Sequence, residues 1–143
     1  MPSIDPQAIG KAFRLERRDR ARAARALGWL IVATAALRIF SYDRLIRLAS
    51  RLPSSARALL SPSECAVAVR RAARVWPAQC LPQAVAGYCL LRRGGRTPAI
   101  TLGVAREGER FDAHAWLDCD GVTVTGASER LYSPLAGAGR RPS

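Results

Sequence analysis

Apolar residues recur at helical intervals through the first half of the chain. In segment 45–52 they lie three or four positions apart with arginines between them, until Pro53 stops the pattern. Such spacing is typical of a helix that buries one face.

Residues 26–37, ALGWLIVATAAL, form the most apolar stretch of the chain. A bilayer span needs roughly 20 apolar residues, so we expect a buried helix here and no stable transmembrane insertion; a peripheral membrane contact is the second interpretation.

The sequence SPSE at residues 61–64 predicts the start of another helix. Ser61 can cap the helix, Pro62 suits its first position, and Glu64 completes a capping box. The helix should run on through CAVAVRRAARV and end before Pro77.

The next helix is located by its proline. Pro82 is tolerated only in a first turn, because further inside it would remove a hydrogen bond and clash with the preceding turn. The helix should therefore begin near residues 79–81 and stop at Gly94–Gly95. Cys80 would then lie at the amino-terminal end of a helix whose inward face includes Leu81, Val85, Tyr88 and Leu91.

After residue 98 the apolar period changes from helical to two. Residues 99–105, 110–119 and 122–125 predict strands, with REGER joining the first two. Asp120–Gly121 is typical of a two-residue hairpin turn between the last two strands. The sequence thus predicts an α+β fold, in which a helical amino-terminal half precedes a core with one helix packed on a small antiparallel sheet.

The length of 143 residues fits one compact domain with helical additions. Residues 1–25 contain seven basic and three acidic side chains with little apolar periodicity, which predicts a flexible basic segment. We expect a helical subdomain over residues 26–60 and the α+β core over residues 61–135. Residues 136–143 have the composition of a flexible tail.

The net charge is +12, from 23 basic and 11 acidic residues. All basic residues except Lys11 are arginines, and they are spread along the chain. A nucleic-acid-binding protein usually gathers its charge on one face and adds aromatic stacking or a groove-reading helix, and neither feature is readable in this sequence. We therefore expect no nucleic-acid partner. An acidic protein or peptide explains the charge as well, and so does simple solvation.

The four cysteines are Cys65, Cys80, Cys89 and Cys119, and they lack the paired spacing of a zinc finger. Because the chain has a single histidine, a structural zinc site would need almost every sulfur. We expect no metal and no cofactor, and we interpret the cysteines as reduced thiols of a cytoplasmic protein. The first 25 residues are too charged for a signal peptide.

Cys80 differs from the other cysteines because it is expected at a helix start. There the helix dipole and the unpaired N–H groups favour a thiolate, and the same N–H groups could hold an oxyanion. His114, on the predicted strand 110–119, could act first as base and then as acid. A cysteine and a histidine are the smallest set of groups that thiol-based acyl transfer needs. The alternatives are a buried structural cysteine and a hydrogen-bonded structural histidine.

The strand that carries His114 is predicted to have two different faces. Trp116 shares the face of His114, while Ala113, Ala115 and Leu117 form a small apolar face suited to packing on helices. Trp116 fits either core packing or a wall that excludes water from the thiolate.

The segment from Cys80 to Gly121 resembles the transglutaminase-like core of the lasso-peptide leader peptidases, often called the B protein or its protease half. The matching motifs are CLP opening a helix, LLRRGG closing it, LGV in a strand, and AHAW followed by an acidic residue and DG. The resemblance covers residues 64–126 and implies a papain- or transglutaminase-like core.

The resemblance also implies a function. Such proteins are cysteine peptidases that remove the leader from a ribosomally made lasso precursor peptide, and Cys80 matches their nucleophile and His114 their general base. A small leader-recognition protein presents the precursor, and an ATP-dependent cyclase of the asparagine-synthetase type closes the macrolactam. Because little chain precedes residue 26, we expect the recognition protein to be separate.

One departure from the family concerns its third catalytic residue, an Asp on the strand after the hairpin. Counting back from the predicted turn places Ala127 opposite His114, and no Asp lies around it. Glu129 is the nearest carboxylate on that side, diagonal to the histidine, while Asp112 and Asp118 lie on the strand of His114 itself. We therefore predict a Cys–His pair and leave the orienting group open.

Two further functions fit parts of the sequence. A catalytically silent scaffold that binds the precursor or the cyclase would explain the missing acid, and the charge alone favours nucleic-acid binding. A reactive Cys80 thiol would distinguish the peptidase from the scaffold. A steep salt dependence of DNA or RNA binding would support nucleic-acid binding. The same chemistry could also transfer an acyl group to an amine instead of water.

Overall fold

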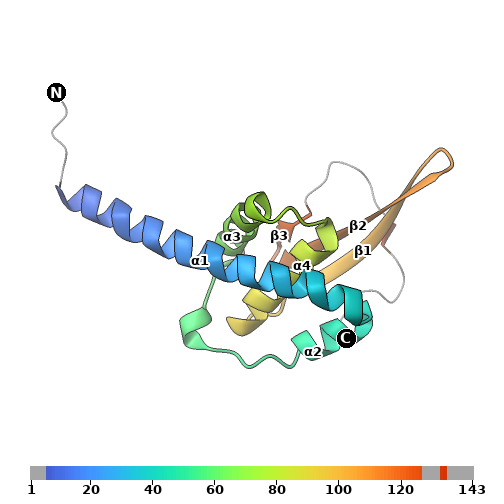
Figure 1. Ribbon diagram of the computed structural model, residues 1–143, viewed down its shortest axis with the longest axis horizontal. Helices are drawn as coiled ribbons and strands as arrows, with labels where there is room; N and C mark the ends of the chain where they lie inside the picture. Colours follow the sequence, from blue (N-terminus) through green and yellow to red (C-terminus); the bar gives the residue numbers. More distant parts are fainter. Residues whose placement is uncertain (1–5, 127–132, 135–143) are drawn as a thin grey trace.

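The computed structural model describes residues 6–126 and 133–134 and has the predicted α+β architecture (Figure 1). Within these residues the helical elements are α1 (Pro6–Ile39), α2 (Tyr42–Ala49), the 3-10 helix η1 (Ala56–Ala58), α3 (Pro62–Val75) and α4 (Cys80–Arg93). The strands are β1 (Ala99–Glu107), β2 (Arg110–Cys119), β3 (Val122–Thr125) and β4 (Ser133–Pro134). They form one antiparallel sheet in the order β3-β2-β1-β4.

Helix α1 begins earlier than the sequence predicted. We expected a flexible segment up to residue 25, and the structure instead has a continuous helix from Pro6 to Ile39. The physical reason is local: alanine, arginine and glutamate are good helix formers, and a proline is compatible with a first turn. Apolar periodicity missed this part because a largely solvated helix does not need it. Arg22 forms an ion pair with Glu64 of α3, which ties α1 to the core.

The apolar part of α1 is buried on one side only. Ala26, Leu30 and Ala33 belong to the core and pack with α3 and α4, whereas Ile31 and Val32 are 41% and 55% exposed. The expected buried helix is thus confirmed for one face. Among the described residues, no helix has the length and apolar content that crossing a membrane requires.

The predicted start of α3 is confirmed. The backbone N–H of Glu64 donates to Ser61 Oγ at 3.1 Å, and the N–H of Ser61 donates back to Glu64 Oε1 at 3.3 Å, which completes the capping box. This reciprocal pair satisfies two donors that a helix start leaves without a helical partner. The helix ends at Val75, before Pro77 as expected.

Helix α4 is the central element of the core. It begins at Cys80 and ends at Arg93, before Gly94 and a left-handed Gly95 (φ 79°). All its residues from 84 to 91 are buried. Gly87 allows its close approach to the sheet, because a Cβ there would lie 2.6 Å from Leu117 Cδ2. Helices α3 and α4 thus pack on the same face of the sheet (Figure 1).

The turn between β2 and β3 agrees with the prediction, but the pairing of the two strands beyond the turn does not. Asp120 (φ 51°) and Gly121 (φ 78°) both have positive φ, as a type I′ turn requires. Beyond the turn the register shifts at a bulge, so that Leu117 pairs with Thr125 instead of the residue before it. Counting back from the turn was therefore wrong by one position, and Ala127 lies outside the described residues.

Candidate active site

Cys80 is the first residue of α4, as the sequence predicted. The N-cap residue Gln79 has an extended backbone and makes no side-chain hydrogen bond to the first turn. Because Pro82 has no N–H, the first turn offers the backbone N–H groups of Cys80 and Leu81 to an incoming ligand. The side chain of Gln83 donates to the carbonyl oxygen of Ala78 at 2.7 Å and fixes the entry into the helix.

The other three cysteines are buried in the core, whereas Cys80 is half-buried. Burial raises the pKa of the Cys65 thiol and the pKa of the Cys89 thiol to about 12 each. Cys65 Sγ lies 3.7 Å from the carbonyl oxygen of Gly87, inside the α3–α4 contact. Both thiols stay protonated at neutral pH and are buried, so the more accessible Cys80 is favoured as the reactive thiol.

Brief treatment of the folded protein with iodoacetamide at neutral pH is expected to label Cys80 first. Cys65 and Cys89 should react only after unfolding, because their raised pKa values keep them as thiols and the core excludes the reagent. Peptide mapping by mass spectrometry measures the label at each cysteine. Preferential labelling of Cys65, Cys89 or Cys119 in the folded state would remove the basis for assigning Cys80.

His114 lies in the middle of β2, opposite Gly103 of β1. Its Nε2 atom is 2.6 Å from the carbonyl oxygen of Gly126, and its ring stacks with the Trp116 ring at a centroid distance of 6.2 Å and an interplanar angle of 26°. A carbonyl oxygen only accepts, so Nε2 carries the proton in this contact. A neutral imidazole of this tautomer has its basic lone pair on Nδ1.

The backbone conformation at Gly126 requires glycine. Its φ of 76° lies in the left-handed region, and a Cβ would meet the carbonyl oxygen of Ala115 and lie 2.9 Å from Trp116 Cα. Gly126 therefore lies directly against the backbone of β2, which brings its carbonyl oxygen to His114. Sequence reasoning missed this group because it considered only carboxylates; a glycine directly after the last predicted strand was the available signal.

The hydrogen bond described for His114 Nε2 is to a carbonyl oxygen and not to a carboxylate. Asp118 instead accepts a hydrogen bond from Thr123 Oγ1 at 2.8 Å, and it lies four residues along β2, about 13 Å at ~3.3 Å per residue. Asp112 lies opposite Ala105 of β1. Glu129, the third candidate, lies outside the described residues.

The chain direction places Cys80 toward the His114 end of β2. Helix α4 leads into β1, whose first residue Ala99 pairs with Asp118, so the carboxy-terminal end of α4 lies near the end of β2 (Figure 1). From the contact between Gly87 and Leu117, Cys80 lies about 10 Å back along the helix at ~1.5 Å per residue. His114 lies about 10 Å back along the strand in the same direction.

A pocket of about 330 Å³ lies beside the first turn of α4, and neither Cys80 nor His114 is among its lining residues. It is lined by Gln83 from the first turn of α4 and by Thr125 and Gly126 at the end of β3. His114 alternates along β2 with Ala115 and Leu117, which are buried under the helices as predicted. Its side chain therefore leaves the sheet on the face opposite to these helices, and its Nε2 atom contacts the carbonyl oxygen of Gly126. Gln83 of the first turn of α4 and Gly126, the partner of His114, thus line the same pocket.

Within residues 6–126 and 133–134, no three His, Cys, Asp or Glu side chains converge as a metal site would require.

Comparison with known proteins identifies one relationship. A family model described as the transglutaminase-like superfamily matches residues 27–136, a range that includes Cys80, His114 and Gly126. No curated protein and no solved structure matches the chain.

Proposed function

Because the chain belongs to the transglutaminase-like superfamily, we propose that it is a cysteine peptidase that removes the leader from a ribosomally made lasso precursor peptide. The observation that carries this proposal is the half-buried Cys80 at the uncapped start of α4, in a chain whose single histidine, His114, lies on β2. The superfamily includes enzymes that hydrolyse peptides and enzymes that transfer acyl groups to amines. The AHAW motif followed by DG favours the leader peptidases within it.

In the proposed reaction the Cys80 thiolate attacks the carbonyl carbon of the leader–core bond, after its proton has passed to His114. The backbone N–H groups at the start of α4 stabilise the resulting oxyanion. The imidazolium then protonates the leaving amine as the C–N bond breaks, which leaves the leader as a thioester on Cys80. Water, deprotonated by His114, hydrolyses the thioester and restores the thiol and the neutral imidazole.

Gly126 acts in this proposal as a positioning residue. Its carbonyl oxygen takes the place that an aspartate has in related enzymes: it fixes the ring orientation and keeps the proton on Nε2, so that Nδ1 serves as the base. A neutral carbonyl stabilises an imidazolium less than a carboxylate does. Trp116, stacked on the imidazole, limits the access of water to it.

The proposed partners follow from the resemblance to the leader peptidases. A separate leader-recognition protein would present the precursor, and an ATP-dependent cyclase of the asparagine-synthetase type would consume the freed amino terminus. The proposed setting is the cytoplasm, where the thiols described here stay reduced.

The test is cleavage of a lasso precursor peptide in the presence of a leader-recognition protein. We expect the purified chain, mixed with the recognition protein and precursor, to release a leader with a free carboxylate, and iodoacetamide to block the release. Mass spectrometry of the products distinguishes hydrolysis from transfer to an added amine. An intact precursor in the presence of the recognition protein and a reactive Cys80 would instead support the silent scaffold.

A further inference from the structure

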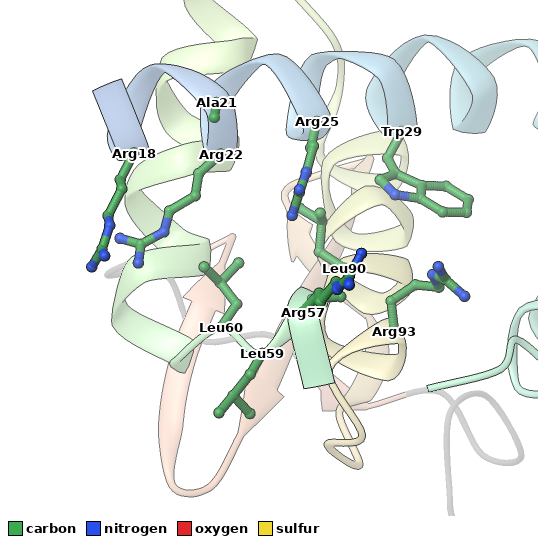
Figure 2. A pocket seen from close by; sticks show the side chains of 11 residues that line it. Arg18, Ala21, Arg22, Arg25, Trp29, Arg57, Leu59, Leu60, Leu90 and Arg93 are labelled. Atoms are coloured by element: carbon green, nitrogen blue, oxygen red, sulfur yellow. The ribbon is translucent and has the colours of Figure 1, made fainter. Parts of the chain in front are cut away.

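A groove of about 300 Å³ lies between α1, η1 and the end of α4 (Figure 2). Its walls come from the middle of α1, from η1 and the residues after it, and from the last turn of α4. Leu90 and Arg93 of α4 line the groove, and Cys80 opens the same helix ten residues earlier, about 15 Å away along the axis at ~1.5 Å per residue. The groove is therefore a separate surface from the candidate active site.

Five arginines line this groove, contributed by three elements: Arg18, Arg22, Arg25, Arg57 and Arg93. The first three are spaced four and three residues apart on α1, which places them on one face of the helix. Figure 2 shows their side chains extending from α1 toward Leu59 and Leu60. Like charges gathered in one concave surface repel one another and raise the local positive potential.

Most of this charge is not neutralised by the protein itself. Arg22 pairs with Asp19 and Glu64, and Arg93 donates to the carbonyl oxygen of Pro53 at 2.6 Å. Within residues 6–126 and 133–134, Arg18, Arg25 and Arg57 form no ion pair. Three guanidinium groups are thus available to anionic groups of a ligand.

The remaining surface of the groove is apolar. Trp29 from α1 and Leu59 from the segment after η1 line it, and Leu59 is 63% exposed. A simple anion would leave this apolar surface uncovered, whereas a peptide that carries both carboxylates and aliphatic side chains would cover it.

We propose that this groove is a docking site for an acidic, leucine-containing peptide segment of a partner protein. Carboxylates of the segment would pair with the guanidinium groups of Arg18, Arg25 and Arg57, and an aliphatic side chain would pack on Leu59 and Trp29. A nucleic acid fits less well, because Asp19 and Glu64 limit the positive surface at one end and Trp29 is the one aromatic side chain lining the groove.

The experiment measures binding of the full-length protein by fluorescence anisotropy. The probe is a short fluorescein-labelled peptide in which aspartate and glutamate alternate with leucine. Two control probes are the same peptide with Asn and Gln in place of the acids and a single-stranded RNA of similar length. We expect the acidic peptide to bind at least about tenfold more tightly than either control.

The variant R18E/R25E/R57E should bind the acidic peptide at least about tenfold more weakly than the wild type, and L59S should lower the affinity by a smaller factor. The matched control R44E/R51E/R74E changes the net charge equally on exposed arginines outside the groove and should bind within about threefold of wild type. If the triple reversal does not fold, as judged by circular dichroism, R18Q/R25Q/R57Q replaces it.

Equal weakening in the groove and control variants would overturn the proposal, since the attraction would then come from overall charge. Tighter binding of the RNA than of the acidic peptide would overturn it as well. The measurement requires no catalysis, so it succeeds or fails independently of the proposed peptidase activity.

Discussion

Replacing Cys80 with alanine is expected to reduce leader hydrolysis by roughly 10⁴-fold or more, because the reaction loses its nucleophile. The fold should persist, since Gln79 and not Cys80 is the N-cap of α4, and alanine is the best helix former. Single-turnover cleavage of the precursor measures the rate, and thermal unfolding measures stability.

Cys89→Ala is the matched control for this substitution. It removes a buried thiol of the same helix, so it should lower stability and leave the single-turnover rate of the folded protein within a few-fold of wild type. If Cys80→Ala is folded and still cleaves at the wild-type rate, Cys80 is not the nucleophile.

His114→Ala is expected to cut hydrolysis by roughly 10²–10⁴-fold, as loss of a proton-transfer group does. The same single-turnover assay measures the effect. If this variant hydrolyses the precursor at the wild-type rate, His114 is a structural residue that stacks on Trp116 and not a catalytic one.

The role of Gly126 is separated from that of Glu129 by two further variants. Gly126→Ala would displace the carbonyl, because a Cβ has no room against Ala115 and Trp116, and we expect a loss of about 10²-fold. Glu129→Gln should change the rate by much less. Since His114 is the only histidine, its ¹⁵N resonances report the tautomer directly: Nε2–H in the wild type and a mixture in Gly126→Ala. An Nδ1–H tautomer in the wild type would contradict the positioning role.

The features that the sequence predicted correctly depend on short-range chemistry. The capping box of Ser61 and Glu64 needs only four residues, Pro82 restricts the start of α4 by its own sterics, and Asp120–Gly121 sets its turn by positive φ. Each signal acts within one turn or hairpin, so it can be read without knowing the tertiary structure.

The features that the sequence missed depend on contacts between elements. The bulge near Leu117 arises in the pairing of β3 with β2, and the conformation of Gly126 depends on its close approach to the backbone of β2. The arginines of the groove come from α1, η1 and α4, so only the packing of these elements brings them together. The early start of α1 was missed for a different reason: apolar periodicity detects buried faces, and residues 16–25 of this helix are mostly exposed.

The central claim is that His114 activates the Cys80 thiol, and one measurement tests it without any substrate. The rate of Cys80 alkylation by iodoacetamide is followed at about pH 6, where an unassisted thiol is almost fully protonated. We expect the wild type to react at least about tenfold faster than His114→Ala under the same conditions. Equal rates in the two proteins would contradict the claim.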